Sequence, residues 1–378
     1  MTLAETEIAA SGHPGPLMRS LPLSVILSVR DDSATLREVL LAIRASDLPA
    51  GSYEIIVVDD ASTDSSVAIA ARYADTVVKL TGRSCGAAYA RNRGVELARG
   101  EVVAFVDGDA VVRPDTLSRA LAALDENSDV DAVSASRDAN SGARNFISQY
   151  WNLLLRFGEQ HHSGNCAQFA PGCGVIRRRA FLTAGMYDEW RFSTGGLESV
   201  ELGDRLLGAG RGAQLSSELS VTHLKAWNIG LVCEEVWKRS RLLARSLGYF
   251  RMSALAPSEV VFTLSRALIP AALLLGTLTL VAAFIPPPLD GSDKLVVALA
   301  VLMMTNLPLH RFYATTRGFG FAARSAPVHL IVQTVAAVAL CTGWVLRYLI
   351  GDVSPDATTQ AYSEVGLETW PPVPRKLR

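Results

Sequence analysis

Residues 102–109 read Val-Val-Ala-Phe-Val-Asp-Gly-Asp, and this stretch decides the fold because five apolar residues run directly into two carboxylates that flank a glycine. A continuous apolar run of this length predicts a strand buried on both faces, as in a parallel sheet covered by helices. In such sheets ligands bind beyond the carboxyl ends of the strands. We therefore expect Asp107 and Asp109 to face a ligand.

The same pattern of an apolar run followed by acids recurs upstream of this strand. The elements expected there are strands at Leu23–Val29, Tyr53–Val58 and Thr76–Leu80, and helices at about Leu36–Ile43, Ser65–Tyr73 and Gly86–Ala98. Strands alternating with amphipathic helices predict an α/β fold with a mostly parallel sheet. We place this domain at residues 21–228, after a flexible leader at 1–20.

The two carboxylates of the Asp-Gly-Asp stretch suit a hard divalent cation. Oxygen ligands favour Mg²⁺ or Mn²⁺, and such a cation can neutralise a diphosphate. The pattern is weak when it stands alone, because Asp and Gly are ordinary turn residues. Its interpretation therefore depends on the sequence around it.

Eight sequence blocks in a fixed order surround this stretch and include it. They are residues 25–32 (VILSVRDD), 55–64 (IIVVDDASTD), 86–94 (GAAYARNRG), 107–109 (DGD), 172–178 (GCGVIRR), 185–189 (GMYDE), 198–206 (ESVELGDRL) and 221–225 (VTHLK). In this order the blocks resemble the family-2 glycosyltransferases, whose nucleotide-sugar domain has the GT-A fold. The resemblance spans about residues 21–250.

The resemblance implies roles on the donor side of the site. Val29, Asp32 and Asp59 would line the nucleoside pocket, with Asp59 accepting a hydrogen bond from the base. Arg91 would face the donor, where a cation near a diphosphate is favourable; the alternative is a solvated helix residue. Asp60 and the nearby Asp64 fit turn and helix-capping roles equally well.

The resemblance also implies metal ligands and an acceptor side. Asp107 would meet the ribose or the metal, and Asp109 would bind the metal directly. His223 would be a further metal ligand or a diphosphate contact, although a lone histidine is also compatible with a structural role. Gly172 begins a block on the acceptor side and would contact substrate.

The catalytic base is the point at which this chain departs from the family. An inverting transfer needs a group that takes the proton of the acceptor hydroxyl. The family uses the Asp of a Glu-Asp pair at a helix start, whereas this chain has Glu198-Ser199. Three possibilities remain: Glu198 takes over, Glu201 reaches in from the same helix face, or catalysis is impaired.

The C-terminal third has a membrane-like composition, with seven charged residues between Ala267 and Ile350. Apolar segments at 267–285, 295–309 and 330–346 predict about three helices within a transmembrane region at 259–350. A basic amphipathic helix at 229–258 is typical of a membrane interface; the alternative is a helix that covers the edge of the sheet. Trp227 and Trp237 fit interface anchors.

The distribution of basic residues predicts the topology. We interpret His310–Arg324, with its three arginines, as a cytoplasmic loop. The chain would then be a multi-pass inner-membrane protein with a cytoplasmic catalytic domain. If all three segments span the membrane, the tail at 351–378 lies outside the cell.

Composition and missing motifs exclude several other functions. The net charge of −1 argues against nucleic acid as a partner, and the five cysteines include no C-x-x-C pair of a zinc knuckle. No Q-x-x-R-W motif of the processive synthases occurs, which favours transfer of a single sugar.

The expected function is therefore a metal-dependent, inverting glycosyltransferase at the membrane. It would move one sugar from a nucleotide-diphosphate sugar, with UDP the expected nucleotide, to a lipid-linked or other glycan acceptor. Membrane lipid would be a further partner. The alternative is a catalytically degenerate protein that binds a nucleotide sugar without turnover.

Overall fold

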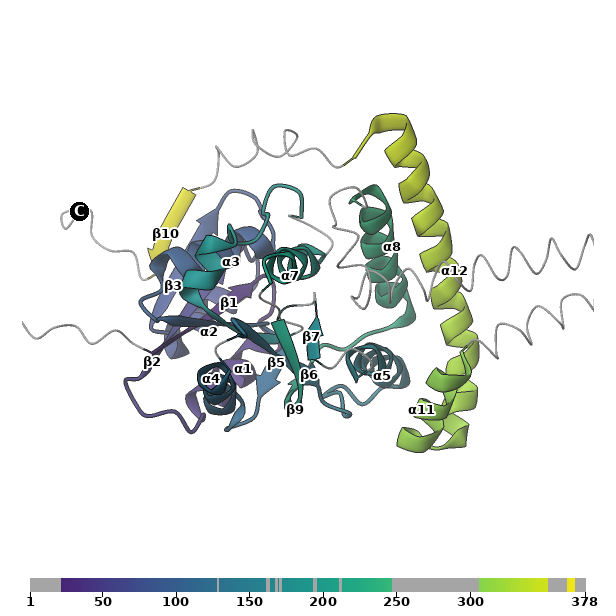
Figure 1. Cartoon of the computed structure of the whole chain (residues 1–378), viewed down its shortest axis with the longest axis horizontal. Helices are drawn as coiled ribbons and strands as arrows, with labels where there is room; N and C mark the ends of the chain where they lie inside the picture. Colours follow the sequence, from purple (N-terminus) through teal and green to yellow (C-terminus); the bar gives the residue numbers. More distant parts are fainter. Residues whose placement is uncertain are drawn as a thin grey trace, which may run out of the picture.

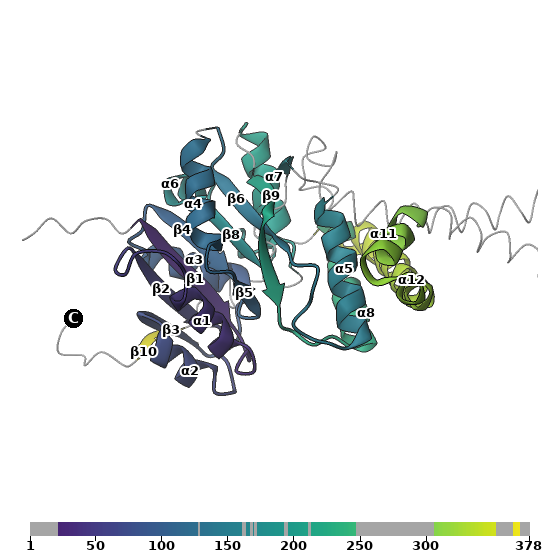
Figure 2. The same ribbon diagram turned by 90° about the horizontal axis from the view of Figure 1, so that it is seen from below.

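The computed structural model describes residues 22–127, 129–160, 164–166, 169, 172–192, 196–210, 213–246, 306–352 and 366–370. These residues form one large sheet with helices on both faces, and a further layer of helices at one side (Figures 1 and 2). The predicted leader at 1–20 lies outside the described residues.

The sheet is mixed. Its strands are β1 (Leu23–Val29), β2 (Tyr53–Asp59), β3 (Thr76–Thr81), β4 (Val102–Val106), β5 (Ala110–Val112), β6 (Ala132–Arg137), β7 (Gly164–Cys166), β8 (Cys173–Arg177), β9 (Ala213–His223) and β10 (Gly366–Trp370). They follow the order β10-β3-β2-β1-β4-β8-β6-β9-β5, and β7 pairs with β9.

The predicted α/β fold is confirmed, but the sheet is mixed rather than mostly parallel, with parallel pairs among β1 to β4 and between β6 and β9. Strands β1 to β4 pair in parallel, but β8 runs antiparallel to both β4 and β6. An apolar run fits a sheet covered on both faces whichever way its neighbours run. The sequence pattern therefore predicts the strands and does not reveal their directions.

Helices cover both faces of this sheet. They are α1 (Leu36–Arg44), α2 (Ser66–Tyr73), α3 (Ala87–Leu97), α4 (Thr116–Glu126), α5 (Phe146–Gln160), α6 (Arg178–Thr183), α7 (Glu198–Gly208), α8 (Ile229–Ser246), α11 (Leu307–Arg317) and α12 (Phe319–Ile350). In β1, Val25 and Leu27 pack in the core with α1, α2 and α4, and Ile26 packs in the core with α3, α6 and α7. Burial on both faces explains the unbroken apolar strands.

Among the described residues, one helix is long and apolar enough to cross a membrane, namely α12, with a mean hydropathy of 1.8 over its most apolar window. It contains the predicted segment 330–346. The segment 267–285 and most of 295–309 lie outside the described residues. Asn306 is the N-cap residue of α11, so the last residues of the second segment, 307–309, belong to α11. The multi-pass prediction is thus not supported.

The predicted loop His310–Arg324 is helical instead. It is divided between α11 and α12, which meet at Gly318. Arg317 donates to Asn140 Oδ1 at 2.6 Å and to Gln149 Oε1 at 2.8 Å, and Arg324 lies over the ring of Phe146. These two arginines hold α11 and α12 against α5 and its N-terminal loop, so their presence does not indicate a loop between membrane spans.

The predicted interfacial helix also lies against protein. Of the range 229–258, the structure describes α8, which packs between the sheet and α12 (Figure 2). Its apolar residues Val232, Val236 and Leu243 are buried, and their cluster includes residues of α5 and α12. The apolar face of α8 is therefore covered by the chain itself.

The C-terminal tail supplies an edge strand, although its sequence shows no clear structural signal. Strand β10 pairs antiparallel with β3, with Leu367 opposite Leu80 (Figure 1). This pairing places residues 366–370 on the same side of any membrane as the sheet. It disagrees with the conditional prediction that the tail lies outside if all three segments span the membrane.

The contact of α8 with α12 gives a test of this arrangement. A Cβ on Gly343 would meet the carbonyl oxygen of Arg241 and would lie 2.8 Å from Ala244 Cβ. We expect Gly343→Ala to destabilise the protein by about 1–3 kcal/mol through overpacking. The matched control Gly320→Ala, in open space on the same helix, should stabilise it by about 0.5–1 kcal/mol. Equal midpoints in thermal unfolding for the two variants would contradict the close packing.

Candidate active site

The site lies beyond the carboxyl ends of β1, β2 and β4, as expected for parallel strands. Asp107 follows β4, and its backbone N–H donates to the carbonyl of Gly172 at 3.0 Å. Asp109 is held by β9, because the N–H of Leu224 donates to its carbonyl at 2.8 Å. Strand β9 pairs with β5 so that His223 lies opposite Ala110. Pairing of the two strands thus brings His223 to the Asp-Gly-Asp turn.

Asp107, Asp109 and His223 form a cluster in which one ligand atom of each lies within 4.8 Å of the others. Among the described residues neither ring nitrogen of His223 has a hydrogen-bond partner, although the side chain is buried. Burial lowers the pKa of His223 well below its ordinary value, so the imidazole is neutral and can donate a lone pair. Buried nitrogens without partners are costly, and a cation at this cluster would satisfy one of them.

Glycine at position 172 leaves room for this histidine. Gly172 has a positive φ of 85°, which side-chain-bearing residues rarely adopt. A Cβ there would lie 2.5 Å from His223 Nε2. Gly172, predicted as a substrate contact, lines the cavity described below and also allows the imidazole to reach the acids.

The electrostatics of Asp109 favour a cation at this cluster. Burial, and then the neighbouring charge of Asp107, raise the pKa of Asp109 to about 6. Two carboxylates that repel each other in a partly dry site are stabilised by a positive charge between them. Two oxygen ligands and one imidazole nitrogen suit Mn²⁺ or Mg²⁺, so the predicted ligands fit the predicted metals.

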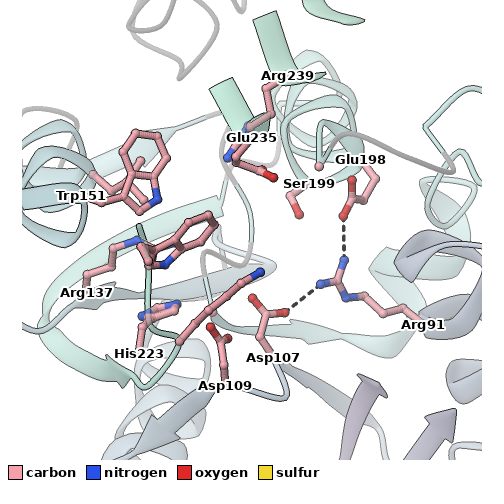
Figure 3. A pocket seen from close by; sticks show the side chains of 15 residues that line it. Arg91, Asp107, Asp109, Arg137, Trp151, Glu198, Ser199, His223, Glu235 and Arg239 are labelled. Atoms are coloured by element: carbon pink, nitrogen blue, oxygen red, sulfur yellow. Dashed lines mark hydrogen bonds and ion pairs between the residues drawn. The ribbon is translucent and has the colours of Figure 1, made fainter. Parts of the chain in front are cut away.

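Arg91 connects this cluster to α7. Its guanidinium donates to Asp107 Oδ1 at 2.8 Å and to Glu198 Oε1 at 2.9 Å (Figure 3). Burial alone would lower the pKa of Arg91, but the charges of Asp107 and Glu198 outweigh it, and the pKa lies above its ordinary value. The alternative of a solvated helix residue is wrong, because Arg91 is 8% exposed.

Two cavities meet at these residues. The larger has a volume of about 470 Å³ and lies over β1 and the start of α3. The smaller, of about 250 Å³, lies between β9, α5, α7 and α8 (Figure 3). Among the described residues, those that line both are Arg91, Asp107, Asp109, Lys225 and Glu235.

The larger cavity contains two of the predicted nucleoside residues, Val29 and Asp32. Asp32 Oδ2 accepts a hydrogen bond from the N–H of Arg30 at 3.1 Å, and burial raises the pKa of Asp32. A Cβ on Gly108 would lie 2.7 Å from that same oxygen. The glycine of the Asp-Gly-Asp stretch therefore leaves space for Asp32.

The third predicted nucleoside residue, Asp59, is not among the residues that line either cavity. Its side chain is fully buried and accepts a hydrogen bond from the N–H of Ser62 at 3.1 Å. Asp60 lines the larger cavity instead, where it accepts hydrogen bonds from the N–H groups of Cys85 and Gly86 at the start of α3. Strand alternation could have revealed this, since Asp59 shares a face with the core residue Val57.

The smaller cavity includes Glu198 and Ser199 at the start of α7. Glu201 is absent from its lining and instead accepts two hydrogen bonds from Arg205, at 2.6 and 2.7 Å. The structure thus gives no support to Glu201 as a group facing the acceptor.

Sequence reasoning missed most of the remaining wall of the smaller cavity. These residues are Arg137, Trp151, Leu155, Lys225, Trp227, Glu235 and Arg239. Trp227, interpreted as a membrane anchor, instead contacts Trp151, and the Nζ of Lys225 lies 4.6 Å from the centre of its ring. Only the packing of α5, α8 and β9 brings these residues together.

The raised pKa of Asp109 predicts how metal affinity depends on pH. Below about pH 6 the metal-free carboxyl is protonated and must lose its proton before it can bind a cation. We expect the affinity for Mn²⁺, measured by titration calorimetry, to be constant above about pH 7. The affinity should fall by up to about tenfold per pH unit below pH 6. An affinity that stays constant down to pH 5 would contradict the raised pKa of Asp109. Because the pKa of His223 is low, no second proton should compete.

Comparison with known proteins supports the family resemblance. Residues 24–184 match the family model described as Glycosyl transferase family 2. The chain is 39% identical over 122 residues to the uncharacterized glycosyltransferase YibD of Escherichia coli, a match that covers 31% of this chain and 34% of the relative.

It is 35% identical over 111 residues to the poly(ribitol-phosphate) beta-N-acetylglucosaminyltransferase TarS of Staphylococcus aureus, covering 28% of this chain and 19% of TarS. The matched segments thus span about a third or less of these two relatives.

A solved structure shares the fold. The mannosyltransferase PcManGT from Pyrobaculum calidifontis, in complex with GDP-Man and Mn²⁺, aligns with a TM-score of 0.58 at 20% identity. The alignment covers 84% of this chain and 87% of that one. Residues 24–184 therefore match the family-2 glycosyltransferases, and the described part of the chain has an α/β fold of the GT-A type.

Proposed function

We propose that this protein transfers a single sugar from a nucleotide-diphosphate sugar to an acceptor hydroxyl, with the help of Mn²⁺ or Mg²⁺. The observation that carries the proposal is the cluster of Asp107, Asp109 and His223 at the junction of two cavities. One cavity would hold the donor and the other the acceptor. The Pyrobaculum structure with a sugar nucleotide and Mn²⁺ supports this assignment.

The larger cavity suits the donor. Val29, Asp32 and Asp60 line it and would contact the nucleoside, with UDP the proposed nucleotide. Asp107 and Asp109 line the same cavity, so a diphosphate bound there would reach the cation that they would hold. The bound cation would neutralise the charge that develops on the leaving diphosphate.

The smaller cavity suits the acceptor. An acceptor hydroxyl placed there can attack the anomeric carbon while the bond from that carbon to the diphosphate oxygen breaks. A carboxylate of the site would take the hydroxyl proton. This single displacement inverts the anomeric centre. Arg91, already paired to Asp107 and Glu198, keeps two of these acids in place.

We further propose a membrane-proximal acceptor, either lipid-linked or another envelope glycan, at the inner face of the cell membrane. Helix α12 supports this, because its C-terminal end exposes Trp344, Tyr348, Leu349 and Ile350 to more than 60% each. Exposed apolar side chains gathered on one element typically mark a lipid or protein contact. The catalytic domain would then be cytoplasmic.

A second candidate function is binding of a nucleotide sugar without turnover. The observation that favours it is Ser199, which stands where the family has the carboxylate of its base. The intact cation cluster and the buried Arg91 argue for the enzyme, because both would assist a leaving diphosphate.

The enzyme proposal predicts metal-dependent release of nucleoside diphosphate by the full chain in lipid. The assay would supply UDP-N-acetylglucosamine or GDP-mannose as the donor, Mn²⁺ as the cation, and membrane lipid extract as the source of acceptor. We expect Asp109→Asn to lower release by at least about 10²-fold, because the leaving group loses its cation. The control Asp125→Asn, at an exposed position on α4, should stay within twofold of the parent. Tight nucleotide binding without release would favour the second candidate.

A further inference from the structure

We propose that Glu235, on α8, is the general base that deprotonates the acceptor. The inference rests on the proposed transfer reaction and supplies the carboxylate that Ser199 lacks. Helix α8 lies downstream of residues 24–184, which match the family model. The base would therefore come from outside the matched segment.

The other carboxylates that line the smaller cavity are already engaged. Asp107 and Asp109 belong to the cation cluster. Glu198 accepts the hydrogen bond of Arg91 at 2.9 Å, and its side chain is only 8% exposed. The negative charge of Glu198 offsets the positive charge of the buried guanidinium. Protonating Glu198 during catalysis would therefore weaken the ion pair.

Glu235 lies where the base is needed. It lines both cavities, and among the described residues that do so it is the carboxylate outside the cation cluster. It forms no hydrogen bond or ion pair with another described residue, so both carboxylate oxygens are available. An acceptor hydroxyl at the junction of the cavities would be within its reach.

The carboxylate of Glu235 also lies close to the start of α7. Its Oε1 is 3.9 Å from the Cβ position of Gly196, three residues before Ser199. Figure 3 shows Glu235 and Ser199 on the same wall of the smaller cavity. A carboxylate from α8 thus occupies the neighbourhood in which the family's aspartate would project from α7.

The packing of α8 holds Glu235 in this orientation. Val232 and Val236 are buried in the cluster that α8 shares with α5 and α12, which leaves Glu235 and Arg239 facing the cavity. Positions i and i+4 share one helix face. Helix α12 therefore acts on the reaction indirectly, by fixing the rotation of α8.

The proposed step is a single displacement at the anomeric carbon. The acceptor oxygen forms a bond to the anomeric carbon, and the bond from that carbon to the diphosphate oxygen breaks with its electron pair. The hydroxyl proton passes to Glu235, and the nucleoside diphosphate leaves. The proton then passes to solvent, which restores the carboxylate.

The test uses the full chain in lipid, with the sugar nucleotide that the parent turns over and membrane lipid extract as acceptor. We expect Glu235→Gln to lower kcat by about 10²- to 10⁴-fold, with the affinity for nucleoside diphosphate and Mn²⁺ within twofold of the parent. Adding Ser199→Asp to this variant should raise kcat at least tenfold, because the new aspartate returns a carboxylate to the same wall of the cavity. The control Glu234→Gln, on the exposed side of α8, should stay within twofold.

The outcomes separate this inference from the function on which it rests. Glu235→Gln activity within threefold of the parent would overturn the inference, and a loss of 10²-fold or more in Glu198→Gln alone would assign the base to Glu198. A loss of nucleotide affinity or a lowered thermal midpoint in Glu235→Gln would indicate a structural role and would equally overturn it. A parent that releases no nucleoside diphosphate would overturn both proposals.

Discussion

The buried guanidinium of Arg91 is the interaction on which the rest of the site depends. It comes from α3 and binds Asp107 after β4 and Glu198 at the start of α7. Three elements that are far apart in the sequence are therefore joined by one charge at the base of both cavities. The pair with Glu198 is buried on both sides, and breaking a buried pair by removing one partner costs about 3–5 kcal/mol. This arrangement connects the nucleotide-binding half of the fold to the half that holds the acceptor cavity.

Strand β9 and two glycines bring the residues of the cation cluster together. The long strand runs beside β5 and places His223 against the turn that carries Asp107 and Asp109. Gly172 and Gly108 are required because a Cβ at either would press against His223 or Asp32. The cluster is thus assembled from backbone pairing and from the absence of side chains at two positions. Within the described part of the chain neither ring nitrogen of His223 has a hydrogen-bond partner, and burial followed by the charge of Asp107 raises the pKa of Asp109.

The C-terminal helices show how composition can suggest the wrong arrangement. The low charge content of residues 267–350 and the three arginines of 310–324 are typical of membrane spans joined by a basic loop. In the described part of the chain, however, Arg317 and Arg324 contact α5 and its N-terminal loop. The amphipathic pattern of α8 was interpreted as facing lipid, whereas its apolar face packs with α12. Periodicity shows that one helix face is buried, and it does not show whether lipid or protein buries it. Within the described residues, the C-terminal end of α12 is a place where large apolar side chains stay exposed, among them Trp344 and Tyr348.

Four of the strands and the acids at their carboxyl ends could be predicted from the sequence, because they follow from local patterns. Blocks shared with a family predicted that Asp32, Arg91, Asp107, Asp109 and Glu198 belong to one site, and the structure places these five residues around the two cavities. The sequence could not determine strand direction, the exchange of Asp59 for Asp60 at the cavity wall, or the edge strand β10. Nor could it find Glu235, Lys225 and the Trp151–Trp227 pair. Those features depend on which elements pack together, and residues on β9, α5 and α8 meet in one cavity only after the chain has folded.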